Sequence, residues 1–165
     1  MLNGPRTNEA RHLFNPMMCG VLLREAVNAH VRLCGKGMPF PETFLVLPIV
    51  FHKALREELT GYISTKMKVW LAEHDYYLLD FPRRAKAFVP YTRSGLAMAC
   101  HLGILAFEQS DLILGDTRLR RQRGSVFPVA NDEVLALKRT AKYVGRWFAH
   151  TGGPEAILSS WRIRP

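Results

Sequence analysis

The sequence has 165 residues, of which 48% are hydrophobic and 22% are charged, a composition typical of a globular chain with a real core. This length indicates one domain, and the net charge of +9 favours a polyanionic partner or an acidic protein surface. The three cysteines match neither a disulfide framework nor a CxxC metal pair, which favours free buried thiols in a reducing compartment. The first ten residues lack the apolar core of a signal peptide, so we expect a cytoplasmic protein.

The chain begins with a polar segment, residues 1–14, which we expect to be flexible or docked on a partner. Asn15 and Pro16 then form a helix start, because Asn caps the free N–H groups and Pro suits the first turn. Apolar residues follow at helical spacing until Gly35. The pattern predicts a helix from Pro16 to Cys34 that pairs antiparallel with the next helix.

The anchor segment, Pro39–Leu59, contains the longest apolar run of the chain. Pro48 interrupts this run and predicts a helix that is kinked or divided. The run is too short to cross a bilayer, which requires about 20 apolar residues, so no membrane partner is expected. The side chains predicted to be buried are Phe44, Leu45, Leu47, Val50 and Phe51.

Polar side chains follow the apolar run at once, so the anchor helix should leave the core and reach the surface. His52, Lys53, Arg56 and Glu57 are the residues we expect to contact a partner, with Arg56 pairing with a carboxylate. The alternative is a solvated helix end with no partner.

Residues 64–115 suggest a winged-helix-like segment. A helix capped by Ser64, a short helix from Asp80 and, after Pro90, a third helix from Tyr91 to Leu102 precede a hairpin that turns at Gln109–Asp111. The sequence thus predicts one domain, 1–165, that is mainly α with a small β-hairpin. Such a segment can bind DNA or dock on protein. The third helix offers few base-reading side chains on its expected exposed side: Tyr91, Thr92, Arg93, Ser94 and His101.

A basic linker, residues 116–131, joins this segment to a C-terminal helical segment, 132–165. Asn131 or Asp132 should cap its long helix, and the apolar residues near the end indicate a tail that packs. We expect the linker to contact nucleic-acid phosphates, or else to be a solvated loop or a docking strip for an acidic protein. The predicted phosphate-binding residues are Arg118, Arg120, Arg121 and Arg123, with Arg83 and Arg84 from the preceding segment.

The sequence offers no recognisable active site. The six histidines are scattered without metal-ligand spacing, and no GxSxG motif or suitable carboxylate cluster occurs. We therefore predict no catalytic residues, no metal and no cofactor, and a protein that is not an enzyme.

Several stretches resemble the middle component of bacterial three-component ABC ATPase systems, including the Lamassu-type defences against phage and plasmids. They are GKGMPFPETFLVLPIVFHKALREEL from Gly35, FPRRAKAFVPYTRSGLAMACHLGIL from Phe81 and the C-terminal RWFAHTG with ILSSWRIRP. The resemblance implies an adaptor between an SMC-like ABC ATPase and a separate effector, often a nuclease, close to double-stranded DNA. The alternative is an independent winged-helix transcription regulator.

Overall fold

The computed structural model describes residues 14–59, 65–117 and 132–164. Helix α2 (Pro16–Cys34) matches the predicted bounds. The Asn15 side chain accepts the Met18 N–H at 2.7 Å, and Gly35 ends the helix with a φ of 70°. Glycine takes this left-handed conformation without the steric cost that a side chain brings.

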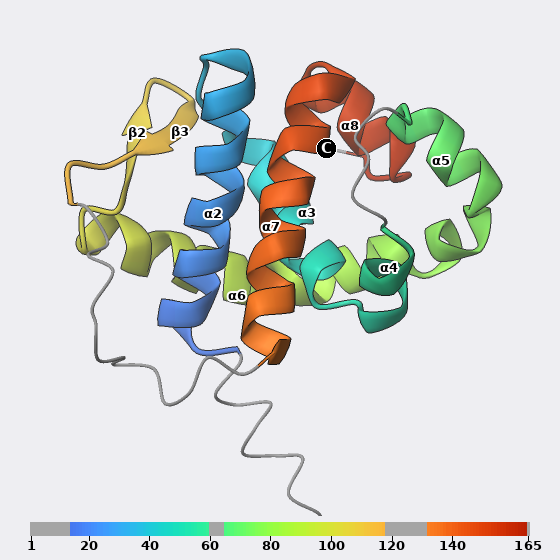
Figure 1. Ribbon diagram of the computed structural model, residues 1–165, viewed down its shortest axis with the longest axis horizontal. Coiled ribbons are helices and arrows are strands. Elements are labelled where there is room, and N and C mark those ends of the chain that lie inside the picture. The colour runs from blue at the N-terminus through green and yellow to red at the C-terminus, as the bar shows by residue number, and fades with distance from the viewer. Residues whose placement is uncertain (1–13, 60–64, 118–131, 165) are drawn as a thin grey trace, which may run out of the picture.

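Helix α2 packs chiefly against α7 (Asp132–Thr151) and α6 (Phe81–His101). Figure 1 shows α2 and α7 side by side and running in the same direction, with α6 crossing behind them. The sequence predicted that α2 pairs antiparallel with the next helix. This is wrong for the main packing of α2, whose chief partners are α7 and α6. Glycines make these crossings close: a Cβ on Gly145 would overlap the Ala26 carbonyl, and one on Gly95 would lie 2.7 Å from Cys19 Cβ.

The anchor segment forms α3 (Phe40–Val50) and α4 (Lys53–Glu58), so its predicted division is confirmed. The break falls at Phe51–His52, and Pro48 lies inside α3. Leu45, Leu47 and Val50 are buried as predicted, but Phe44 and Phe51 are only half-buried. Phe51 follows the helix end and packs at the edge of the core, 4.7 Å from Phe14 and 5.9 Å from Phe88 between ring centres.

The next segment contains α5 (Met67–Glu73), the 3-10 helix η1 (Asp75–Leu79) and α6. The predicted cap Ser64 lies outside the described residues. The predicted break at Pro90 is wrong, because α6 continues through it. Proline has no N–H to donate, so the carbonyl of Lys86, four residues earlier, loses its usual helical hydrogen bond. Both residues are exposed, so water can donate to that carbonyl instead.

The predicted hairpin is confirmed as β2 (Leu105–Glu108) and β3 (Asp111–Leu114). A strand that the sequence did not predict, β1 (Met38–Pro39), adds to β3 and gives an antiparallel sheet of order β1-β3-β2, with Met38 opposite Leu112. The fold class, mainly α with a small β element, is confirmed. A long helix followed by a hairpin is compatible with a winged-helix-like segment, which stays a prediction.

The chain returns to the core at its end. After α7, α8 (Pro154–Ser160) leads to Trp161, which is fully buried with its ring centre 4.2 Å from Phe81. The predicted packing of the tail is thus confirmed. Within the described residues, no helix is both long enough and apolar enough to cross a membrane.

Candidate functional site at the junction of α3, α4 and α7

The end of α3 determines how the predicted partner-binding residues are placed. The last four carbonyls of a helix lack intrahelical partners, and here all four accept hydrogen bonds. Leu47 and Ile49 accept from the backbone of the following turn, at 2.9 and 3.1 Å. Pro48 accepts from Arg84 Nε at 3.0 Å, and Val50 accepts from Arg56 Nη1 at 2.8 Å. Two guanidinium groups therefore cap the negative end of the helix dipole.

Arg56 also connects α3 to α7. Its Nη2 donates to Glu133 Oε1 at 2.6 Å, and its side chain is only 8% exposed. Pairing of Arg56 with a partner carboxylate stays a prediction, and in this structure the chain itself supplies acceptors for Arg56. Sequence patterns could not reveal this, since Glu133 is 77 residues away.

The loss of this contact should be measurable. We expect Arg56→Ala to lower the free energy of unfolding by about 2 kcal/mol, since hydrogen bonds to charged groups contribute about 1.5–3 kcal/mol each and Glu133 is partly solvated. Lys53→Ala, on the same short helix with a side chain 75% exposed, should change it by less than about 0.5 kcal/mol. Urea unfolding of both variants checks this, and equal stabilities would contradict the role given to Arg56.

The other three predicted partner-binding residues differ in exposure. Lys53 and Glu57 point to solvent, 75% and 65% exposed, and lie 3.9 Å apart as an i,i+4 pair. His52 is half-buried and caps α4, accepting the Leu55 N–H on Nδ1 at 3.3 Å. Burial, then the charge of Arg84, lowers the pKa of His52 and keeps Nδ1 an acceptor. Of the four predicted partner-binding residues, Lys53 and Glu57 are therefore the exposed ones.

A groove of about 560 Å³ separates α4 from α7. Lys53, Arg56 and Glu57 lie on its α4 side, and α7 contributes Glu133 and a row of cations, Arg139, Lys142 and Arg146. Sequence analysis did not select this row. The sequence did contain a pattern that could have revealed it, because cations spaced by three and four residues share one face of a helix.

Of the residues predicted to bind nucleic acid, Arg83 and Arg84 lie in the described part of the chain. Arg83 is exposed and pairs with Asp80 at 2.7 Å. Arg84 is half-buried, caps α3 and lies over the Phe88 ring at 5.2 Å, so it has a structural role. The cluster Arg118, Arg120, Arg121 and Arg123 lies outside the described residues.

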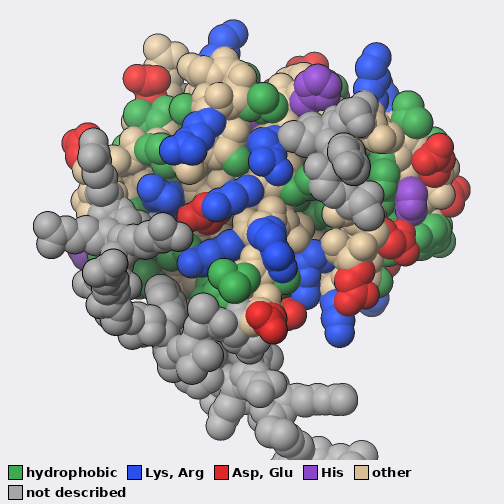
Figure 2. All heavy atoms as spheres, in the orientation of Figure 1, with side chains coloured by type: hydrophobic (Ala, Val, Ile, Leu, Met, Phe, Trp, Pro, Cys, Tyr) green, Lys and Arg blue, Asp and Glu red, His purple; other side chains and the backbone are tan. Residues whose placement is uncertain are grey.

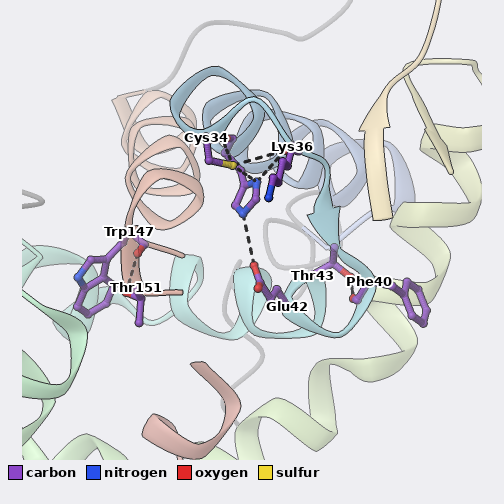
Figure 3. A network of polar contacts seen from close by, with 8 residues as sticks. Cys34, Lys36, Phe40, Glu42, Thr43, Trp147 and Thr151 are labelled. Atoms are coloured by element: carbon purple, nitrogen blue, oxygen red, sulfur yellow. Dashed lines mark hydrogen bonds and ion pairs between the residues drawn. The ribbon is translucent and has the colours of Figure 1, made fainter. Parts of the chain in front are cut away.

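A second polar cluster lies at the other end of α3. Glu42 is 1% exposed, its carboxylate oxygens make no hydrogen bond in the described part of the chain, and Oε2 lies 3.7 Å from His30 Nε2. Figure 3 shows Glu42 pointing towards the end of α2, where Cys34 and Lys36 lie. His30 Nδ1 lies 3.2 Å from the Lys36 carbonyl, which can only accept, so this nitrogen carries the proton and Nε2 faces Glu42.

Burial dominates the chemistry of this pair. It raises the pKa of Glu42 to about 8, with a further contribution from Asp111, and it lowers the pKa of His30. Both groups are therefore neutral near pH 7, and the protonated carboxyl faces the lone pair of the imidazole. A cavity of about 370 Å³ borders the pair.

The thiols are free, as expected, but not all are buried. Cys19 is buried, which raises the pKa of its thiol to about 11, whereas Cys34 is exposed. Among residues 14–59, 65–117 and 132–164, no group of three or more His, Cys, Asp or Glu side chains could hold a metal ion.

The fold and the two sites described above define a small, mostly helical protein. It has a basic groove between α4 and α7 and a buried, neutral Glu–His pair at the other end of α3. The chain belongs to the family described as ABC-three component (ABC-3C) system Middle Component 3, whose profile matches residues 3–165. It is thus a middle component of a three-component system, as the resemblance implied. The comparisons with curated proteins and with solved structures found no match.

Proposed function

We propose that this middle component is a non-catalytic adaptor that links an SMC-like ABC ATPase to an effector, a nuclease, in a defence complex against phage or plasmids. The observation that carries the proposal is the family match over residues 3–165, because a middle component of a multi-component system has partner subunits. The described chain adds a rigid junction of α3, α4 and α7, and side chains on rigid elements suit a docking contact.

The docking surface that we propose is centred on the exposed i,i+4 pair of α4, Lys53 and Glu57. Exchanging the two charges, with Lys53→Glu and Glu57→Lys together, keeps the net charge and the i,i+4 pair. Charges placed opposite like charges of a partner cost affinity, so the exchange should abolish co-purification with the ATPase or the effector and abolish defence.

The matched control exchanges an exposed pair elsewhere, with Asp80→Arg and Arg83→Asp. It should leave assembly at the wild-type level. If the α4 exchange folds, co-purifies with both genomic neighbours and still defends, α4 is a solvated helix end. If the wild-type chain itself does not co-purify with its neighbours, the adaptor role is wrong.

The rival is a winged-helix regulator that reads DNA sequence. The long helix α6 before the β2–β3 hairpin favours it, although Thr92, one of the side chains expected on its exposed face, is buried. Base readout would distinguish a cognate site from other sequences. A strong sequence preference of the isolated protein, lost in Arg93→Ala, would favour the regulator over the adaptor.

A further inference from the structure

Cations of two helices gather on one face of the molecule. Figure 2 shows Lys and Arg side chains collected over α2 and α7, with few acidic side chains among them. We call Arg32 of α2 and Arg139, Lys142 and Arg146 of α7 the basic strip. Lys142 and Arg146 line both the α4–α7 groove and a second hollow, of about 280 Å³, which Arg32 also lines. The strip is thus continuous across two depressions.

The spacing of the strip is fixed by the helix. Arg139, Lys142 and Arg146 follow at intervals of three and four residues, so they share one face and span about 10 Å along the axis. The opposite face of α7 is held in the core by Leu137, Val144 and Phe148. The cations therefore form a rigid row rather than a mobile tail.

These charges are poorly neutralised within the protein. Arg32, Arg139 and Arg146 have no acidic partner in the described part of the chain, and Lys142 shares Glu25 with Arg24 at 3.5 Å each. The Arg146 Nε is buried without a hydrogen-bond partner among the described residues. A buried unsatisfied donor is costly, and guanidinium groups without a carboxylate partner can pair with an incoming anion through their exposed atoms.

The basic strip, on the α2 and α7 side of the two depressions, lacks an apolar centre of the kind that most protein interfaces have. Protein interfaces are centred on aromatic or large apolar side chains. The described side chains that line the α4–α7 groove include no exposed large hydrophobic residue. Among those that line the second hollow, only Leu33 is large, hydrophobic and exposed. The exposed aromatics Phe40 and Phe107 instead lie 5.7 Å apart between ring centres, where α3 begins beside the β2–β3 hairpin. A polyanion with a charged backbone suits the strip better than an acidic protein.

We propose that the basic strip binds the phosphate backbone of duplex DNA without reading its sequence. This site differs from the arginine cluster predicted from the sequence, and the inference stands without the adaptor role. Phosphate contacts carry no base identity, and each releases counterions, so affinity falls with salt.

The test measures binding of the purified full chain to two labelled duplexes of unrelated sequence, by fluorescence anisotropy between about 50 and 200 mM salt. The strip variant combines Arg139→Gln, Lys142→Gln and Arg146→Gln. The control combines Lys66→Gln, Lys68→Gln and Lys86→Gln, three exposed cations at the start of α5, on α5 and on α6, and removes the same total charge. Arg32→Gln with Arg139→Gln, both exposed positions, serves if the strip variant is unstable.

We expect the strip variant to bind both duplexes at least about tenfold more weakly, with a log–log salt slope shallower by about 0.9 per lost contact, while the control stays close to wild type. Equal losses in the two variants would reduce the effect to net charge and overturn the site. Unchanged DNA binding with lost co-purification of a neighbour subunit would also overturn it, and would assign the strip to an acidic protein surface.

Discussion

Gly145→Ala should lower the free energy of unfolding by about 3 kcal/mol or more, since overpacking against an unyielding neighbour costs at least 1–3 kcal/mol. Its added Cβ would overlap the backbone of Ala26 on α2, where no side-chain rotation can relieve the contact. The two helices would have to separate along the main packing contact of the core. Thermal unfolding should show a fall in Tm of roughly 10 °C, since each kcal/mol corresponds to about 2–4 °C in a chain of this size.

Gly153→Ala is the matched control. It lies just beyond α7, nothing lies within 4 Å of its added Cβ, and its φ of −74° suits any residue. Gly153 is also the N-cap of the short helix α8, where Ala is less favourable than Gly, so the control should change the free energy of unfolding by about 1 kcal/mol or less. A wild-type Tm for Gly145→Ala would show that α2 and α7 do not approach in solution as they do in this structure.

Glu42→Gln should remove a pH dependence of stability. The folded pKa of Glu42, about 8, lies above its ordinary value of 4.5, so the folded state binds the extra proton and stability is lost as pH rises through that range. The contribution of His30 to stability has the opposite pH dependence. Its pKa is lowered in the folded state, so it reduces stability only below about pH 6.5, its ordinary pKa. Above pH 6.5, wild type should therefore lose about 1.4 kcal/mol per pH unit through Glu42, and this slope should fall to about half at pH 8, where Glu42 is half-ionised.

Glutamine imitates the protonated carboxyl and can donate to His30 Nε2, so the variant should keep a nearly constant stability over the same interval. Urea unfolding at pH 6.5 and 8 measures the difference. Glu57→Gln, at a position 65% exposed, controls for the loss of one carboxylate and should retain the wild-type slope. If Glu42→Gln has that slope as well, another group titrates and Glu42 is ionised at neutral pH.

Local signals sufficed where the neighbours in sequence are also the partners in space. The bounds of α2 followed from the Asn15 cap, the apolar period and Gly35, all within 21 residues. The β2–β3 hairpin and the buried Trp161 were likewise predicted from alternation, turn residues and the apolar tail.

Local rules failed where distant groups compensate for them. Pro90 does not break α6, because its flanking residues Phe88 and Thr92 pack in the core while the lost hydrogen bond faces water. The strand β1 is two residues long and acquires its identity only from β3, 73 residues later.

The sequence by itself determined a mainly helical, basic chain, and its motifs resembled the middle component of a three-component system. Composition, periodicity and caps are properties of short stretches and can be read from them. Only the tertiary structure decided which charged residues are structural and which are exposed. Arg56 and Arg84 cap α3 and Glu42 is buried beside His30, whereas Arg139, Lys142 and Arg146 line an open groove. Burial and ion pairing depend on residues far apart in the chain, so no local pattern could separate these roles.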